Sequence, residues 1–257
     1  MPTVTNGAEI YYETVGTGET VVFVGDAGYG AWQWGWQHPA VAGPYEAIVT
    51  DLRGVGRSDR GATVDGVETL AADLTAVLAD AGADAAHLVG AGLGGMVALQ
   101  VALSTSRVES LTLVGTAARG HGLDLGPLWG DPGDPDTLER SVAAGLSDAF
   151  LDAHPDAVER MVGWRAEEDA PRPVFEAHAA AVARFDVSDR LYEVTQPTLV
   201  VHGGDDTVWP PERGAALAED LPRGEFHEVA NAGHLVHVEA SRRVNDDLLG
   251  FLAGVSY

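Results

Sequence analysis

Short apolar runs bounded by glycine, aspartate and proline recur along the chain, and they alternate with segments whose apolar residues return every three or four positions. The short runs predict β-strands and the longer period predicts amphipathic helices. Strands are expected at residues 10–15, 21–24, 47–49, 87–89, 111–114, 198–201 and 225–229, with helices between several of them, as at 67–81 and 93–104. This alternation indicates an α/β fold with a mostly parallel sheet covered by helices on both faces.

Two regions depart from the alternation. Turns at Asn6-Gly7 and at residues 16–18, rather than helices, flank the first two strands, which predicts an antiparallel start to the sheet. The stretch 119–194 contains helix-like pieces and no convincing strand; these pieces are 136–146, 147–154, 156–165 and 173–184. We therefore expect one core domain formed by residues 1–118 and 195–257, with a helical insertion at 119–194.

The charge balance is strongly acidic. The chain has 39 acidic and 15 basic residues, a net charge of -24, and all of its basic residues are arginine. This charge argues against nucleic acid as a partner. A GC-rich genome alone can favour arginine over lysine, but the large negative charge is typical of the proteome of a salt-accumulating archaeon. The alternative is an acidic protein from a mesophile.

Other compositional features bear on the chemistry and the cellular compartment of the protein. The chain has no cysteine, so disulfides, thiolate metal sites and a cysteine nucleophile are excluded. No leader-like segment and no apolar stretch of about 18 residues is present, which favours a cytoplasmic protein without a membrane partner. The histidines are not spaced as a metal cluster, and we expect no metal, no other cofactor, and a monomer or homodimer.

A glycine-rich turn follows the strand expected at 87–89. Residues 90–95 read Gly-Ala-Gly-Leu-Gly-Gly, which matches the G-x-G-x-x-G dinucleotide fingerprint. That fingerprint needs an acidic residue at the end of the next strand to hold a ribose, but the strand at 111–114 ends in Gly115-Thr116. The alternative is the nucleophile elbow G-x-S-x-G, with Gly90 and Gly94 as its glycines.

Three further motifs favour the elbow. Residues 51–58 read Asp-Leu-Arg-Gly-Val-Gly-Arg-Ser, residues 203–210 read Gly-Gly-Asp-Asp-Thr-Val-Trp-Pro, and residues 231–234 read Asn-Ala-Gly-His, with Glu239 five residues later. In this order and each after an expected strand, they resemble the α/β-hydrolase family from Gly7 to about Ala253. The resemblance implies an eight-stranded sheet with a cap at 119–194. It also implies Asp206, rather than Asp205, as the acid and His234 as the catalytic histidine.

The differences from the family lie at the positions where the family has its catalytic residues. Gly92 stands where the family has its serine, and Ala91 replaces the histidine that often precedes it. The loop that is usually His-Gly is Gly25-Asp26 here. The backbone N–H groups of Ala27 and Leu93 can still form an oxyanion hole. An ionised Asp26 would oppose an oxyanion there, by about 4 kcal/mol at 4 Å and an effective dielectric of 20.

These departures leave several functions open. Loss of the serine costs on the order of a million-fold in rate, so covalent serine catalysis is excluded. One hypothesis is an enzyme acting on a small, largely apolar ester, lactone or enol, with His234 as general base oriented by Asp206 and Asp26 as a second acid/base or replacement nucleophile. The alternatives are a catalytically inactive ligand-binding pseudo-hydrolase and a cofactor-free lyase or oxygenase. A laboratory replacement of serine at Gly92 is disfavoured because Gly25, Asp26 and Ala91 have also diverged.

Aromatic residues are the candidates for a substrate pocket. Trp32 follows the Asp26 loop, Trp129 and Trp164 lie in the expected cap, and Trp209 follows the acid loop. Tryptophan can line an apolar ligand pocket or fill a structural core. We expect these four to contribute to a pocket for a small molecule.

The acidic composition generates a first prediction. We expect the protein to be less stable in dilute buffer than in molar KCl, because at molar salt the Debye length falls to about 3 Å and charge repulsion is screened. Circular dichroism melting curves across this range of KCl concentration measure the effect. A melting temperature that stays flat between the two extremes would contradict the prediction.

Overall fold

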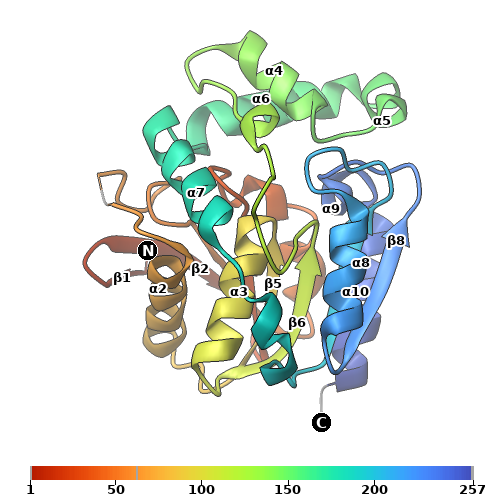
Figure 1. Ribbon diagram of the computed structural model, residues 1–257. Coiled ribbons are helices and arrows are strands. Elements are labelled where there is room, and N and C mark those ends of the chain that lie inside the picture. The colour runs from red at the N-terminus through yellow and green to blue at the C-terminus, as the bar shows by residue number, and fades with distance from the viewer. Residues whose placement is uncertain (1, 62, 256–257) are drawn as a thin grey trace.

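The computed structural model describes residues 2–61 and 63–255, which contain a sheet of eight strands (Figure 1). In chain order the strands are β1 (Thr3–Thr5), β2 (Glu9–Val15), β3 (Thr20–Val24), β4 (Glu46–Thr50), β5 (Ala86–Ala91), β6 (Val108–Val114), β7 (Thr198–Gly203) and β8 (Gly224–Val229). Their order in the sheet is β1-β2-β4-β3-β5-β6-β7-β8. The strands from β4 to β8 are parallel, so the expected mostly parallel sheet is confirmed.

The antiparallel start differs in detail from the expectation. β2 pairs antiparallel with β1, a short strand that the apolar pattern did not predict, and on its other side with β4. β2 and β3 are not neighbours, because β4 lies between them and pairs with both. The connection from β3 to β4 therefore crosses back to the outer edge of β3, which a turn-based interpretation could not detect.

Helices cover both faces of the sheet. The sheet separates two buried apolar clusters. In β3, Val22 and Val24 belong to one cluster, and Val21 and Phe23 belong to the other. The first cluster includes residues of α2 (Val67–Asp80), α3 (Leu93–Ser104) and α8 (Pro211–Asp220). The second includes residues of α1 (His38–Val41), α9 (Val236–Glu239) and α10 (Ser241–Val255). Each face thus has its own core, as the alternation of side chains along a strand requires.

The insertion between β6 and β7 is helical; residues 135–168 lie above the carboxyl ends of the strands, and the last part of the insertion descends beside α3 toward the opposite end of the sheet (Figure 1). It contains η2 (Gly126–Leu128), α4 (Pro135–Ala143), α5 (Asp148–Ala153), α6 (Pro155–Glu168), α7 (Arg172–Arg184) and η3 (Ser188–Glu193). Within the described ranges its strand-like pairing is limited to an isolated bridge between Arg119 and Asp186. We call residues 119–194 the cap. Within the same ranges, every helix is too short or too polar to cross a membrane.

A buried ion pair fastens the cap to the core. Arg165, which is 1% exposed, donates from Nε to Asp169 Oδ2 at 2.6 Å. The other carboxylate oxygen of Asp169 accepts the Trp32 ring N–H at 2.8 Å and the Gly30 backbone N–H at 3.2 Å. Arg165 also donates to Ser141 Oγ and lies over the Tyr29 ring. These two charges are held in the interior because each has several partners.

Removal of this cation gives a second prediction. Arg165→Met leaves Asp169 buried without its counter-ion, and we expect the free energy of unfolding to fall by about 3–5 kcal/mol. Arg172→Met is the matched control, since Arg172 and Glu176 form an ion pair with the same spacing but are 68% and 60% exposed. Its effect should be below about 1 kcal/mol. Urea unfolding in molar KCl measures both, and equal effects would refute the structural role of the buried pair.

Candidate functional site

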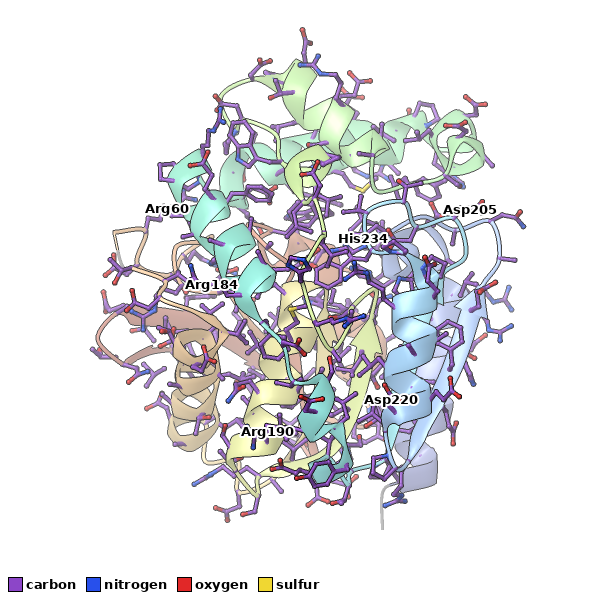
Figure 2. The ribbon with its side chains drawn as sticks, viewed as in Figure 1. Arg60, Arg184, Arg190, Asp205, Asp220 and His234 are labelled. Atoms are coloured by element: carbon purple, nitrogen blue, oxygen red, sulfur yellow. The ribbon has the colours of Figure 1, made fainter. Side chains whose placement is uncertain are left out.

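Four loops meet at the carboxyl edge of the sheet, beneath the cap. Asp26 follows β3, Gly92 joins β5 to α3, Asp206 follows β7 and His234 follows β8. Because these strands are parallel, their carboxyl ends face the same way, which is where open α/β sheets form their sites. Figure 2 shows His234 near the centre of the molecule, between the cap and the sheet.

The turn at Gly92 is a tight connection between strand and helix. Gly92 has φ 49° and ψ −113°, and its N–H donates to Val114 O. A Cβ on Gly94 would overlap the backbone carbonyl of Val24, so glycine there allows α3 to approach β3 closely. Packing of α3 against β3 therefore accounts for Gly94, the second glycine of the elbow motif.

Asp206, His234 and Asp26 form a continuous chain of charged hydrogen bonds. His234 Nδ1 lies 2.8 Å from Asp206 Oδ2, and His234 Nε2 lies 2.8 Å from Asp26 Oδ2. Asp206 is fixed in turn by the backbone N–H groups of Val208 and Trp209, which donate to its Oδ1. All three side chains are buried. The imidazole is thus held between two carboxylates, one on each ring nitrogen.

The second oxygen of Asp26 occupies the position of the expected oxyanion hole. Asp26 Oδ1 accepts the Ala27 N–H at 2.6 Å and the Leu93 N–H at 2.8 Å. These are the two backbone donors proposed from the sequence for a substrate oxyanion. In this structure they bind a carboxylate of the protein itself, so Asp26 fills the hole rather than lying beside it and repelling its occupant.

Asp26 and Gly92 share one space. A Cβ on Gly92 would fall inside van der Waals contact with the Cγ and both carboxylate oxygens of Asp26. A serine at position 92 and the present conformation of Asp26 are therefore mutually exclusive. The glycine at the elbow therefore leaves open the space that the Asp26 carboxylate occupies.

The two carboxylates determine the charge of His234. Burial acts to lower its pKa, but Asp206 and Asp26 outweigh burial and raise the pKa to about 10. Burial acts to raise the pKa of Asp206, yet His234 and hydrogen bonds from His202 and His234 hold it below its usual range. At neutral pH the site therefore contains an imidazolium between carboxylates, not the neutral imidazole that a general base requires.

The cap supplies a residue that sequence reasoning missed. His178 of α7 is fully buried, accepts the Gly28 N–H at Nδ1 and lies 3.1 Å from Arg53 O at Nε2. Burial lowers its pKa to about 4, so it is neutral and its tautomer is fixed with the proton on Nε2. His178 thereby holds the loop that carries Asp26. A lone histidine on an amphipathic helix gives no signal in the sequence that would identify this role.

The cap also holds both sides of the His234 loop. The Gly233 N–H donates to Glu239 Oε1 at 3.0 Å, and the Ser147 N–H of the cap donates to Glu239 Oε2 at 2.7 Å. The Leu235 N–H donates to Gly145 O, also in the cap, at 2.7 Å. Cap and core together therefore determine where the imidazole lies.

The four tryptophans proposed for a substrate pocket lie in different surroundings. Trp209 is fully buried and stacks beside His234 at a ring-centroid distance of 6.2 Å. Trp129 packs against Phe175, whose ring borders the Asp26 loop at Gly28. Trp32 and Trp164 line a common cavity that Asp26 and His234 do not line. The four residues therefore do not surround a single pocket.

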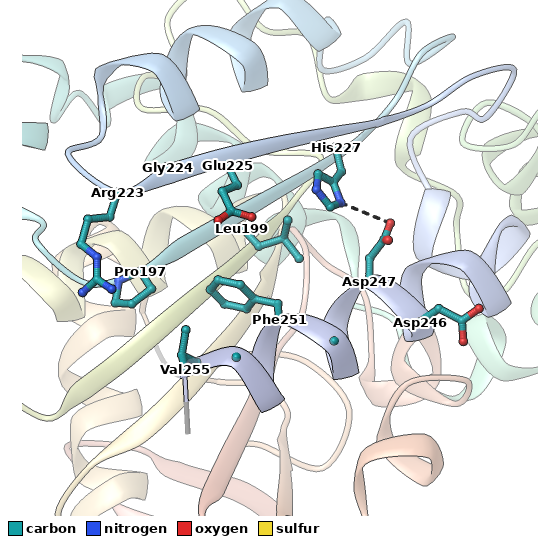
Figure 3. A pocket seen from close by; sticks show the side chains of 12 residues that line it. Pro197, Leu199, Arg223, Gly224, Glu225, His227, Asp246, Asp247, Phe251 and Val255 are labelled. Carbon is teal, nitrogen blue, oxygen red and sulfur yellow. Dashed lines mark ion pairs between the residues drawn. The ribbon is translucent and has the colours of Figure 1, made fainter. Parts of the chain in front are cut away.

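A second cavity lies outside this cluster. At the β8 edge of the sheet a cavity of about 580 Å³ separates the strands from α10, and His227 faces Asp247 there at 3.4 Å (Figure 3). None of the candidate catalytic residues lines it. In residues 2–61 and 63–255, no group of three or more histidine, aspartate and glutamate side chains is arranged to hold a metal ion.

Comparisons with known proteins agree with this architecture. Residues 25–241 match the family described as alpha/beta hydrolase fold. The chain is 30% identical to a putative carbamate hydrolase RutD of Azorhizobium caulinodans, over 95% of each chain. It is 32% identical to a 2-hydroxy-6-oxononadienedioate/2-hydroxy-6-oxononatrienedioate hydrolase of Paraburkholderia phymatum, covering 95% of this chain and 90% of that protein. The solved structure of Est816, an N-acyl homoserine lactone degrading enzyme, superposes with a TM-score of 0.84 at 29% identity, over 97% of this chain and all of that one.

The shared space of Asp26 and Gly92 gives a third prediction. Gly92→Ala should lower the free energy of unfolding by about 2–4 kcal/mol, because it adds overlap with the Asp26 carboxylate to the cost of a positive φ. In an Asp26→Gly background only the backbone cost of about 1 kcal/mol should remain. The coupling between the two positions is then about 1–3 kcal/mol in a double-mutant cycle.

Gly82→Ala serves as the control for that cycle, since Gly82 has φ 73° and open space where a Cβ would be placed. It should cost about 1 kcal/mol in either background. Additive effects of Gly92→Ala and Asp26→Gly in urea unfolding would show that the two side chains do not compete for one space.

Proposed function

The chain belongs to the α/β-hydrolase family, and we propose that it hydrolyses a small, largely apolar ester, lactone or enol with the Asp26 carboxylate in place of a serine nucleophile. The observation that carries this proposal is the position of Asp26, with Oδ1 on the two backbone donors and Oδ2 on His234 Nε2. Similarity to proteins named as acting on a carbamate and on a lactone supports a small-molecule substrate.

The resting charges suit a carboxylate nucleophile. A serine needs a neutral histidine to remove its proton, whereas a carboxylate is already ionised and needs no base before it attacks. With an ester or lactone, Asp26 Oδ2 forms a bond to the acyl carbon and the bond from that carbon to the alkoxy oxygen breaks. His234, present as an imidazolium, gives its Nε2 proton to the departing alkoxide. The products of this step are an acyl-Asp26 anhydride, an alcohol and a neutral His234.

The second step uses the backbone donors. His234, no longer paired with an ionised Asp26, takes a proton from water, and the hydroxide attacks Asp26 Cγ. The negative charge then develops on Asp26 Oδ1, which already lies on the Ala27 and Leu93 N–H groups. Collapse of this adduct releases the carboxylate product, and Asp26 returns its proton to solvent. His234 is again an imidazolium, and the net reaction is addition of one water across the ester bond.

A second candidate function rests on the observation that the hydrogen-bonding groups of the site are all paired within the protein. Both backbone donors and both imidazole nitrogens already have partners within the protein, and Asp26 is 1% exposed. A site that is complete without substrate also suits a ligand-binding pseudo-hydrolase, in which Asp26 blocks the hole permanently. Substrate entry in the enzymatic case requires the cap to move. The two functions differ in whether Asp26 is ever modified.

The setting of this function follows from composition. We propose a cytoplasm at molar salt, as in a halophilic archaeon, since a net charge of -24 on 257 residues is strongly repulsive in dilute solution. Activity assays therefore belong in molar KCl. The buried pair between Asp26 and His234 lies inside the protein, where salt screens poorly.

Isotope labelling gives the fourth prediction. The protein is screened with ester, lactone and enol substrates in molar KCl, and a single turnover is then run in ¹⁸O-labelled water. We expect one labelled oxygen in the peptide that contains Asp26, because water attacks its Cγ. Asp26→Asn should lower kcat by about 10⁴-fold or more. Gly92→Ser alone should also be inactive, since its side chain displaces Asp26.

Several outcomes would contradict this proposal. Label in the product acid alone would contradict attack of water on Asp26 Cγ. Turnover that survives His234→Ala would reject the role of the histidine. Absence of turnover, combined with esterase activity in an Asp26→Gly and Gly92→Ser double variant, would favour the pseudo-hydrolase. Melting temperatures of each variant control for misfolding.

The same site gives a distinctive pH profile. The value of kcat/KM, which reports the free enzyme, should fall as pH rises through about 10, where His234 loses its proton, and should show no loss on acidification through 6.5, the ordinary pKa of histidine. The stability from the raised pKa is complete below pH 6.5 and is lost as pH rises toward 10. An acid limb near pH 6.5 in the kcat/KM profile, which reports the free enzyme, would contradict the imidazolium resting state.

A further inference from the structure

A cleft lined by three tryptophans lies at the junction of cap and core. It has a volume of about 340 Å³ and is lined by Trp32, Gly35, Trp36, Arg160, Trp164 and Glu168. Trp32 comes from η1 (Ala31–Trp34) and Trp36 from the loop that follows it, while Trp164 and Glu168 come from α6 of the cap. We call these six residues the tryptophan cleft. Its volume is within the range of small-molecule sites.

The walls of the cleft present aromatic surface rather than hydrogen-bonding groups. Trp36 and Trp164 have ring centroids 6.0 Å apart at an interplanar angle of 76°, so they form two adjoining walls. Trp32 is held in place, since its ring N–H donates to Asp169 and its backbone N–H to Glu168. Trp164 is 37% exposed, which is unusual for so large an apolar side chain.

The charge of the cleft is carried by Glu168. Its Oε2 accepts the Trp32 N–H at 3.0 Å, and its Oε1 has no hydrogen-bond partner among the described residues. Burial raises its pKa, and Asp51 and Asp169 act in the same direction, whereas the Trp32 N–H and Arg57 act to lower it. Arg160 brings positive charge to the same cleft, but it is exposed, so its repulsion of a cation is weak and is screened by salt.

We infer that the tryptophan cleft binds a methylated ammonium cation, with the methyl groups against the tryptophan rings and the charge toward Glu168. Aromatic faces attract cations through their quadrupole, and a quaternary ammonium loses little hydration on entering such a site. The free oxygen of Glu168 supplies a counter-charge without having to give up a partner. The strongly negative net charge of the protein further favours a cationic ligand.

The cleft is separate from the site of the proposed hydrolysis, because neither Asp26 nor His234 lines it. Asp169, which accepts the Trp32 ring N–H and the Gly30 N–H, nevertheless links the cleft to the segment that follows the Asp26 loop. Binding there is measurable without any turnover.

The experiment compares choline with 3,3-dimethylbutan-1-ol, a neutral molecule of nearly the same shape. Each is titrated into the full-length protein at constant ionic strength in molar KCl, and tryptophan fluorescence and calorimetry report the Kd. We expect saturable binding of choline at about one equivalent and at least tenfold weaker binding of the neutral molecule. Trp164→Ala and Glu168→Gln should each weaken choline binding by about threefold or more, and Arg160→Gln should strengthen it.

Trp129→Ala is the matched control, since it removes a cap tryptophan outside the cleft and should leave the Kd unchanged. Melting temperatures verify that each variant is folded. Equal affinity for the two molecules, no saturable binding of choline, or a Kd unaffected by Trp164→Ala would overturn the inference. Asp26→Asn should bind choline normally, so failure of the hydrolytic proposal and failure of this one are distinguishable.

Discussion

The arrangement of the site depends on one steric constraint: a side chain at position 92 and the Asp26 carboxylate would occupy the same space. The turn after β5 and the loop after β3 are so close that only one of them can carry a side chain into the region between the backbone donors and His234. Here the Asp26 side chain occupies this region, and Gly92 has no side chain that would compete with it. Every other property of the site, including its charge and its resting protonation, follows from which of the two positions carries the side chain.

A carboxylate in that place changes the electrostatics of the whole cluster. In the interior an ion is tolerated only with partners, and Asp26 has two backbone N–H groups and an imidazolium. The imidazolium in turn has Asp206 on its other nitrogen. In the reaction that we propose, the histidine therefore begins as an acid and not as a base.

The cap contributes to the site by holding the loops that carry Asp26 and His234. His178 holds the Asp26 loop, while Gly145 and Ser147 hold the chain on either side of His234, directly or through Glu239. Any cap movement that admits a substrate must disturb these bonds. The buried Asp169 carboxylate opposes such movement, because it accepts hydrogen bonds from Gly30 and Trp32 of the core while it is paired with Arg165 of the cap.

The sequence by itself determined the strand and helix alternation, the helical insertion and the family resemblance, because apolar periodicity and glycine-rich turns are local properties of the chain. It also predicted Gly92, Asp26, Asp206 and His234 as candidate site residues, and the structure brings these four positions together. It could not determine that β4 separates β2 from β3, since strand order depends on contacts distant in sequence. The occupation of the oxyanion hole by Asp26, the role of His178 and the gathering of Trp32, Trp36 and Trp164 in one cleft were likewise decided only by the tertiary structure. Each of these depends on where a side chain points after segments distant along the chain have packed together, and no local pattern encodes that direction.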